Sequence, residues 1–232
     1  MLIDNTNIKI LNAVLMEKNI QPSSIELDGE YLWLSKSLSP IFPKQKFKFT
    51  SIEIKLYLKG KSESDVKNKV GLLIDKCKEC NLNFEDDFYY KSFLINSNTE
   101  NTLRKDTKKL NLSFIGYSYK EEVTEVMNRI TSKTINVSGN LETPAIVEIT
   151  PTTALADITL EGLADDPIII KNLTANKTVV LDGELQKVTV DGMNKYGDTD
   201  MWDFPRLNPG TNTITVNKNN CDIKIKYKPR YI

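Results

Sequence analysis

From Thr131 to its end, the chain alternates apolar and polar side chains in short runs separated by turn residues, and this pattern restricts the fold more than any other feature. Helical spacing is absent here, and turn signals recur about every 8–12 residues, as in a two-sheet β-sandwich. We expect strands in the segments TINVSG, AIVEITP, DITLEGL, PIIIKNL, TVVLDGELQKVTVDG, NTITV and CDIKIKYK. The sequence therefore predicts a β-sandwich domain over residues 131–232.

The preceding residues have a different pattern, with one amphipathic helix between strands. Lys46–Lys59 reads as a long strand with one buried and one solvated face. A helix is predicted over residues 62–81, capped by Ser62, with Asp65 as a short form of the capping-box acid. Its apolar stripe consists of Val66, Val70, Leu73, Ile74 and Cys77. Two strands follow the helix, so we expect an α+β domain over residues 1–130 and a mainly β protein.

Weaker signals flank this core pattern. Asp28-Gly29 lies between apolar runs, as a two-residue hairpin turn would, and predicts a strand pair within residues 23–35. LDGE recurs at residues 181–184 and is expected to form a hairpin turn there as well. Residues 120–130 read as a short helical turn or a polar linker, and we place the domain boundary near residue 130.

Charge balance and the absence of histidine narrow the range of functions. Lys plus Arg number 31 and Asp plus Glu number 31, so nothing attracts the whole protein to nucleic acid or to an anionic membrane. The absence of histidine removes the commonest general base and most zinc and copper sites. We expect no cofactor, no metal, no secretory signal and no membrane span. Three cysteines make no disulfide framework and suit a reducing cytoplasm.

A CxxC pair, Cys77 and Cys80, falls at the C-terminal end of the predicted helix. Too few further cysteines are present for a zinc site. The dipole at this end of a helix does not lower a thiol pKa, as a redox pair would require. We interpret the pair as structural, and Cys221 as part of the core.

Two acidic features could carry chemistry but have simpler interpretations. The segment at residues 191–200, DGMNKYGDTD, is rich in oxygen ligands, yet Met193 and Lys195 occupy two positions where a calcium loop needs ligands. We expect a loop. The adjacent carboxylates Asp86-Asp87 and Asp165-Asp166 would point to opposite faces of a strand and cannot act as a pair, so both are expected to mark turns.

Basic and aromatic side chains suggest possible contact surfaces. Lys44–Lys48 and Lys224–Arg230 are basic stretches, which we interpret as solvated strand faces, with Ile223, Ile225 and Tyr227 buried in the second. Trp33 and Trp202 could stack on sugar rings, although aromatic residues beside Pro and Leu more often fill a core.

Several short motifs of the second domain occur in a distinctive order. They are Ala145–Ile149 after Pro144, LDGE at 181–184, Val190-Asp191-Gly192, Asp203-Phe204-Pro205-Arg206-Leu207, Asn208-Pro209-Gly210, Asn212-Thr213-Ile214 and Tyr227-Lys228-Pro229-Arg230. In this order and spacing they resemble the C-terminal domain of the phage distal tail protein family, a tail component of long-tailed phages and prophage-derived particles. The strand, helix, strand, strand plan of the first domain fits the same family.

One loop carries much of this resemblance. Its residues are Trp202, Phe204, Pro205, Leu207, Pro209, Gly210 and Asn212. We expect Phe204 and Leu207 to anchor the loop to the sandwich, while the prolines and Gly210 fix its backbone. The loop is then a rigid connection between sheets, and no catalytic residue is expected.

The resemblance implies a structural virion protein without enzymatic activity. Family members form rings, typically hexamers, in which the N-terminal domain builds the ring and a galectin-like C-terminal sandwich projects outward. The implied partners are further copies of the chain, tail-tube proteins, tail-tip or baseplate proteins and receptor-binding proteins, in a virion tail assembled in the host cytoplasm. Neither a membrane nor sequence-specific nucleic acid is an expected partner. The edge of the Lys46–Lys59 strand is the expected contact between neighbouring subunits.

Two other functions remain open at this point. The sandwich could bind host-surface saccharide, which predicts an exposed Trp202 or Tyr196 beside polar side chains. A wall hydrolase would need two carboxylates about 5–9.5 Å apart across a cleft, and no spacing in the sequence indicates such a pair.

Overall fold

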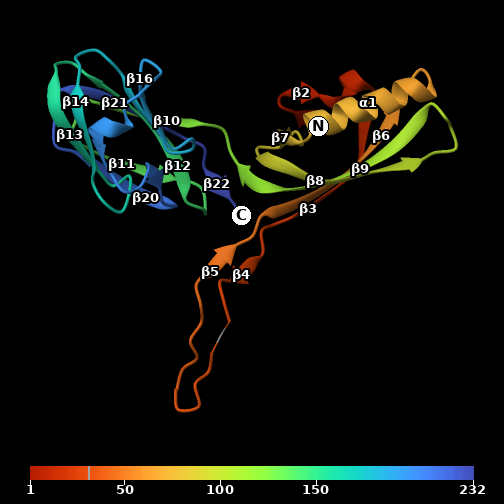
Figure 1. Ribbon diagram of the computed structural model, residues 1–232, viewed down its shortest axis with the longest axis horizontal. Coiled ribbons are helices and arrows are strands. Elements are labelled where there is room, and N and C mark those ends of the chain that lie inside the picture. Colours follow the sequence, from red (N-terminus) through yellow and green to blue (C-terminus); the bar gives the residue numbers. More distant parts are fainter. Residues whose placement is uncertain (31) are drawn as a thin grey trace. The chain divides into compact units, whose positions relative to one another are not determined.

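The structure, a computed structural model, describes residues 1–30 and 32–232. Met1–Ser118 and Tyr119–Tyr231 form two compact domains, each with its own hydrophobic core (Figure 1). Strands dominate both, so the mainly β fold is confirmed. Within the described ranges, no helix has the length and apolar character that a membrane span requires.

The first domain is a curved antiparallel sheet with one α-helix on one face (Figure 1). Its elements are β1 (Leu2–Ile3), β2 (Thr6–Asn7), η1 (Ile8–Leu11), β3 (Ala13–Gln21), β4 (Ile25–Leu27), β5 (Gln45–Phe47), β6 (Thr50–Lys59), α1 (Glu63–Lys76), β7 (Glu79–Asn83), β8 (Tyr89–Asn101) and β9 (Thr107–Tyr119). The strand order in the sheet is β2-β1-β7-β8-β9-β6-β3. Alternation along β6 and β9 buries one face of each strand beneath α1.

The helix begins and packs as its sequence predicts, but it ends earlier. The Ser62 hydroxyl accepts a hydrogen bond from the backbone N–H of Asp65 at 3.2 Å, and Val66, Val70 and Leu73 are buried. The predicted extension to residue 81 is wrong, because α1 ends at Lys76 and Glu79–Asn83 is strand β7. Pairing with β8 on one side and β1 on the other outweighs the helical pattern there.

The predicted strand over Lys46–Lys59 is divided. Its first part is β5, which pairs with β4, and its second part is β6, which pairs with β3 and β9. Both edges of β6 are therefore occupied, and the sequence-based expectation that this strand offers a free edge is wrong.

The hairpin predicted at Asp28-Gly29 is also wrong. The partner of β4 is β5, so the chain crosses a long loop before it returns, and Leu32 forms an isolated bridge with Ile41. Tyr31, within the predicted strand pair, lies outside the described residues.

The second domain is a sandwich of two antiparallel sheets. Its elements are β10 (Val123–Asn128), β11 (Ser132–Val137), β12 (Thr143–Pro151), β13 (Leu155–Glu161), β14 (Ile168–Leu173), β15 (Val179–Asp182), β16 (Lys187–Val190), β17 (Met193–Asn194), η2 (Tyr196–Asp198), β18 (Thr199–Asp200), β19 (Arg206–Leu207), β20 (Gly210–Val216), β21 (Cys221–Tyr227) and β22 (Arg230–Tyr231). One sheet has the order β10-β21-β12-β15-β16-β17, and the other β11-β20-β13-β14-β18. Alternate side chains of both sheets fill the core between them.

The start of this domain differs from its sequence-based interpretation. Residues 123–128 form strand β10, paired with β21 over its whole length, where a helical turn or linker was expected. The two domains accordingly divide between Ser118 and Tyr119, ahead of the boundary expected near residue 130.

Candidate assembly surfaces

Three of the motifs that carry the family resemblance, at Ala145, LDGE and residues 203–207, meet at one corner of the sandwich. The backbone N–H of Ala145 in β12 donates to the Pro205 carbonyl at 2.9 Å, and the N–H of Gly183 donates to the Ala145 carbonyl at 3.0 Å. A Cβ atom on Gly183 would lie 2.1 Å from the Pro205 oxygen. The turn LDGE and the loop 202–212 are thus packed against the same strand, with room only for glycine between them.

The loop 202–212 is anchored by its apolar residues. Leu207 is fully buried in the sandwich core and pairs with Thr143, while Pro205 is also buried. Phe204 is half-buried against the core, and its ring stacks on that of Tyr196 with centroids 5.9 Å apart. These contacts fix the loop to β12, which belongs to the first of the two sheets.

The Pro209-Gly210 turn is held from inside by Asn212. Its side-chain amide donates to the carbonyls of Asn208 at 2.7 Å and Gly210 at 3.0 Å, and accepts from the Asn208 N–H at 2.9 Å. Asn212 is buried, Pro209 is exposed, and Gly210 has a φ of 83°, which favours glycine. Because β20 begins at Gly210 in the other sheet, the loop connects the two sheets.

Arg206 links this corner to two other loops. Its guanidinium lies 2.7 Å from the Asp165 carboxylate, 3.3 Å from Asp203 and 3.7 Å from Glu142. Burial lowers the pKa of the Arg206 guanidinium, but the hydrogen bond to Asp203 and the charge of Asp165 outweigh burial and raise it. Asp165 thus serves as an ion-pair partner of Arg206. Apart from the motif that contains Arg206, no sequence pattern indicates this cluster.

The Trp202 side chain does not pack against the sandwich core. It is 88% exposed, whereas Phe204 and Leu207 of the same loop pack in the core. Trp33, in the first domain, is 68% exposed. The expectation that both tryptophans fill a core is therefore wrong, and each is available for contact with another molecule.

The loop at residues 191–200 is closed by its own side chains. The Lys195 ammonium donates to the Asp198 carboxylate at 2.7 Å and to the Asn172 carbonyl at 3.0 Å. Hydrogen bonds from Lys195 and then from the Asn172 amide hold the pKa of Asp198 below its usual range. A pocket of about 210 Å³ lies beside this network. In the part of the chain that the structure describes, no group of three or more acidic, cysteine or histidine residues could hold a metal ion.

The cysteines and the basic C-terminal strand have structural positions. Cys77, Cys80 and Cys221 are free and buried, with Cys77 at the end of α1 and Cys80 within β7. A hydrogen bond with Cys77, and then burial, raises the pKa of the Cys80 thiol. On β21 the alternation is confirmed, because Ile223, Ile225 and Tyr227 are buried while Lys224 is exposed.

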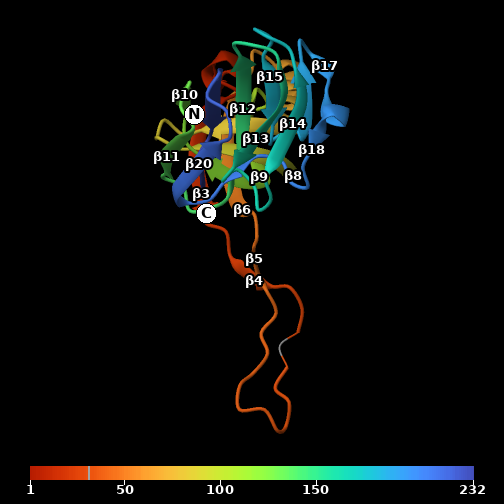
Figure 2. The same ribbon diagram turned by 90° about the vertical axis from the view of Figure 1, so that its left-hand side faces the viewer.

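A long arm in the first domain, residues 22–49, presents the largest concentration of exposed apolar side chains. It comprises β4, β5 and the loop between them, and Figures 1 and 2 both show it leaving the sheet where β3 ends and β6 begins. Its large exposed apolar residues are Ile25, Leu32, Trp33, Leu34, Leu38, Ile41, Phe42, Phe47 and Phe49. Patches of this kind mark interaction sites in soluble proteins.

Sequence reasoning missed this arm because its residues show no regular period. Apolar residues without helical or strand spacing, interrupted by Pro22, Pro40 and Pro43, were the available signal. Next to the arm, β3 is the last strand of the sheet and pairs only with β6 among the described strands. Val14 and Met16 of β3 are exposed. The free edge that was expected on β6 therefore lies on β3.

Comparisons with known proteins agree with the sequence motifs. Residues 138–231 match the family model of the siphovirus-type tail component, C-terminal domain, which confirms the resemblance for the second domain. No curated protein sequence matches this chain.

Solved structures extend the likeness to both domains. The Dit (gp 19.1) protein of phage SPP1, described as a paradigm of the hub adsorption apparatus in phages that infect Gram-positive hosts, is similar with a TM-score of 0.76 at 12% identity, over 100% of this chain and 98% of that chain. A chain in the structure of the phage P2 baseplate in its activated conformation with calcium is similar with a TM-score of 0.57 at 13% identity, over 94% of this chain and 90% of that chain. A chain in the strontium form of that baseplate is similar with a TM-score of 0.55 at 13% identity, over 92% of this chain and 90% of that chain. At these identities the likeness establishes a shared fold.

Proposed function

We propose that this protein is a structural component of a phage tail, a ring-forming distal tail adaptor that joins the tail tube to the tail tip or baseplate. The observation that carries the proposal is that one fold, known from a phage hub protein, accounts for both domains. The family match of the second domain supports the same assignment independently.

Two features of the chain suit repeated contacts with identical neighbours. The arm and the free edge of β3 offer apolar side chains and unpaired backbone groups on the first domain. The equal numbers of acidic and basic residues keep repulsion between copies small. A heterologous contact repeated around an axis closes into a ring, in which every copy makes both halves of the contact.

The finer parts of the proposal rest on the family resemblance. They are a hexameric ring, tail-tube and tail-tip or baseplate partners, attached receptor-binding proteins, and assembly in the host cytoplasm into the virion tail. A non-catalytic role is part of the same proposal. The hydrogen bonds and ion pairs of Arg206 and Asn212 hold loops in place, which is consistent with a scaffold.

The test is negative-stain imaging of the purified protein, alone and mixed with the tail-tube and tail-tip proteins of the same phage. The proposal predicts closed rings with a central opening, either alone or in the mixtures. Particles of single-chain size in every mixture would refute it.

Saccharide binding by the second domain is a second candidate, favoured by the exposure of Trp202. An exposed indole can stack on a sugar ring, and Asp203 beside it in the chain offers a polar group. Glycan-array binding by the native protein that is lost in Trp202→Ala and retained in Trp33→Ala would support it. Equal binding by all three proteins would argue against it.

A further inference from the structure

A pocket of about 210 Å³ lies in the second domain and is lined from both sheets of the sandwich. Asn172 belongs to β14 in one sheet, whereas Val179, Val190 and Met193 belong to β15, β16 and β17 in the other. Lys195, at the start of η2, completes this part of the lining. A ligand in the pocket would therefore contact both sheets and the turn that follows β17.

The apolar part of the lining reaches the core of the sandwich. Val179 is 1% exposed, and Val190 is partly buried against the same core. Met193 of the same lining is 71% exposed, and its flexible side chain can adapt to the shape of a ligand. At roughly 30 Å³ per water molecule, the pocket corresponds to about seven waters, which is the size of a small organic molecule. It therefore accommodates a short apolar group.

Lys195 places a nearly buried charge in this lining. Its side chain is 11% exposed, and its ammonium donates to the Asn172 carbonyl at 3.0 Å and to the Asp198 carboxylate at 2.7 Å. An ammonium group has three N–H donors. Within the described residues two of them are used, so the third is available to a ligand.

Three further side chains of the lining offer hydrogen-bond donors. The Thr174 hydroxyl and the Asn194 side-chain NH₂ group make no hydrogen bond to another residue in the part of the chain that the structure describes. The Lys177 ammonium lies 2.5 Å from the Asp191 carboxylate and keeps two further N–H groups. Because Lys177 is half exposed, these groups can turn toward a ligand.

The acceptor oxygens of the lining, by contrast, already have partners. Asp198 accepts from Lys195 on one carboxylate oxygen and from the Asn172 amide, at 3.0 Å, on the other. The side-chain oxygen of Asn194 accepts from the Tyr196 N–H at 2.9 Å. A ligand that accepts hydrogen bonds therefore suits this lining better than one that donates them.

The charges around the pocket favour a ligand with one negative charge. Lys177 and Lys195 lie in the lining with Asp198, and Asp191 pairs with Lys177. After the hydrogen bond from Lys195, the charge of Lys171 also lowers the pKa of Asp198, so a third lysine is close. Three ammonium groups against two carboxylates leave one positive charge, which a carboxylate would balance.

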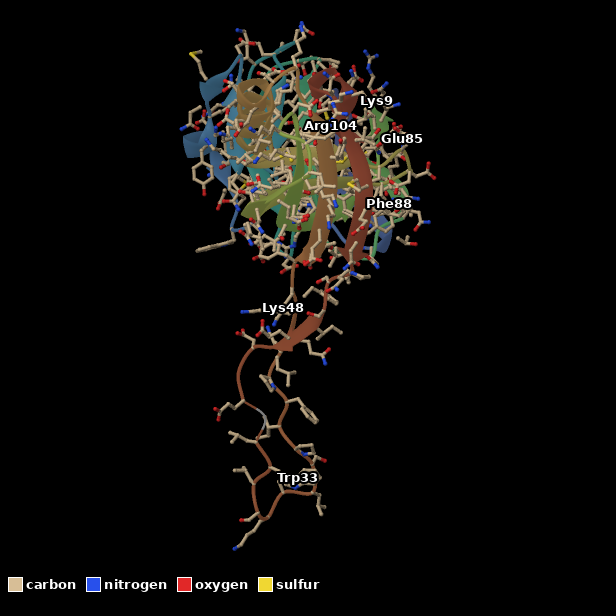
Figure 3. All side chains as sticks on the ribbon, turned by 90° about the vertical axis from the view of Figure 1, so that its right-hand side faces the viewer. Lys9, Trp33, Lys48, Glu85, Phe88 and Arg104 are labelled. Atoms are coloured by element: carbon tan, nitrogen blue, oxygen red, sulfur yellow. The ribbon has the colours of Figure 1, made fainter. Side chains whose placement is uncertain are left out.

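The exposed tryptophan of the arm offers less to an anion. Figure 3 shows Trp33 near the far end of the arm, where its indole N–H donates to the Ser37 carbonyl at 3.0 Å. An indole has no other donor, and the face of its ring carries negative potential. A carboxylate therefore gains more from the pocket than from this side chain.

We propose that the pocket binds a carboxylate group that carries a short branched apolar chain. The carboxylate accepts hydrogen bonds from Lys195, Lys177 and Thr174, and the chain lies against Val179 and Val190. A small organic acid and a peptide that ends in valine or leucine share this chemistry. The inference is independent of the proposed function, because it concerns a site within one domain of a single chain.

Methyl NMR spectroscopy tests the proposal. The native chain, labelled with ¹³C at its valine methyl groups, is titrated with 3-methylbutanoate, which has the required carboxylate and branched chain. We expect saturable shifts of the Val179 and Val190 signals, with a dissociation constant of about 1 mM for a ligand of this size. 3-Methylbutanamide has the same shape without the charge and should bind about tenfold more weakly.

Two exposed positions of the lining allow changes that preserve the fold. Lys177→Met removes a charge and Met193→Glu adds a carboxylate beside the ligand, so each should weaken binding of 3-methylbutanoate about fivefold, as expected for an exposed ion pair. Lys187→Met and Leu185→Glu make the same chemical changes at exposed positions outside the pocket. These controls should bind 3-methylbutanoate like the native chain.

N-acetylvaline identifies the source of the carboxylate. It presents the same groups as the carboxyl end of a peptide, and N-acetylvaline amide provides its uncharged counterpart. Tighter binding of N-acetylvaline than of 3-methylbutanoate assigns the site to a peptide end, and the reverse order assigns it to a small acid. Either order supports the proposal if both amides bind more weakly than their acids.

Three results would overturn this inference. They are the absence of saturable Val179 and Val190 shifts with both acids, equal binding of acids and amides, and equal effects of the pocket and control variants. A chain that gives any of these results but assembles into rings leaves the proposed function standing. A chain that binds the acids but forms no ring leaves this inference standing.

Discussion

The backbone N–H of Ala145 donates to the carbonyl oxygen of Pro205 at 2.9 Å, across residues that lie far apart in the sequence. Gly183 closes the same corner by donating to the Ala145 carbonyl. Motifs that looked like separate turn signals in the sequence are therefore parts of one packed corner. At this corner the loop that connects the two sheets is held against β12 and the turn between β15 and β16.

Replacing Gly183 with alanine should destabilise the second domain by roughly 2–3 kcal/mol. The added Cβ would lie 2.1 Å from the Pro205 oxygen and 2.7 Å from the Ala145 oxygen, so backbone must move. Differential scanning calorimetry of the full chain should show a lower unfolding temperature for this domain. Gly197→Ala is the control, because a Cβ at Gly197 meets no atom within 4 Å. Equal effects of the two changes would contradict the packing described for the corner.

Asn212→Ala should cost about 1–3 kcal/mol, because it leaves the carbonyls of Asn208 and Gly210 and the Asn208 N–H without their side-chain partner. Asn212→Asp keeps an acceptor for the N–H but cannot donate to the carbonyls, so we expect it to be destabilising as well. Hydrogen exchange at residues 208–212 should accelerate in both variants. Unchanged exchange would show that the prolines and glycine suffice to hold the turn.

Arg206→Met should destabilise the second domain by about 0.5–1 kcal/mol at low salt, since its carboxylate partners are largely exposed and screened by solvent. The difference from the native protein should shrink at high salt. Urea unfolding at two salt concentrations measures both effects. Lys187→Met, a change at an exposed position, serves as the control. A salt-independent loss would mean that Arg206 acts through packing of its side chain.

Ser62→Ala should destabilise the first domain by about 1 kcal/mol, because the Asp65 N–H loses its cap. Ser64→Ala lies in the same turn at an exposed position and should be neutral or slightly stabilising. Thermal unfolding of both variants makes the comparison. A similar loss from the two would assign the effect to something other than the cap.

The same helix start should make stability depend on pH through Asp65. The hydrogen bond from the Lys61 N–H, and then that from Lys69, lower the pKa of the Asp65 carboxyl in the folded protein. A lowered folded-state pKa stabilises the fold above the unfolded value of about 3.9, and this contribution is lost as the pH falls through the folded-state pKa. Asp65→Asn should therefore lose less stability than the native protein between pH 6 and pH 3. Lys69→Met, which keeps the Lys61 hydrogen bond, should fall between the two. Identical pH profiles for the three proteins would contradict this assignment.

Local sequence patterns predicted the elements that are specified by a helix cap, by helical spacing or by the alternation of apolar and polar side chains. The Ser62 cap, the buried stripe of α1 and the alternation along β21 are all present. Strands β14, β15, β16 and β21 lie within the segments proposed for them, and β11, β12, β13 and β20 each begin two residues before theirs. In each case a regular period or a cap specifies which residues face the core.

The remaining features depend on partners distant in the sequence. Cys80 lies in a strand because β7 pairs with β1 on one side and with β8 on the other. The helical pattern of residues 62–81 contains no sign of these partners. Asp28-Gly29 does not close a hairpin, because β4 pairs with residues beyond a long loop. Trp202 and the arm are exposed although their composition suggests a core, because composition alone does not distinguish an apolar side chain in a core from one at the surface.

Native mass spectrometry of the purified protein across a concentration series, with and without tail-tube and tail-tip proteins, tests the ring assignment most directly. The proposed function predicts one closed assembly at a fixed multiple of the 26.4 kDa chain mass, six on the family resemblance, that persists on dilution. A single chain at every concentration and in every mixture would contradict it.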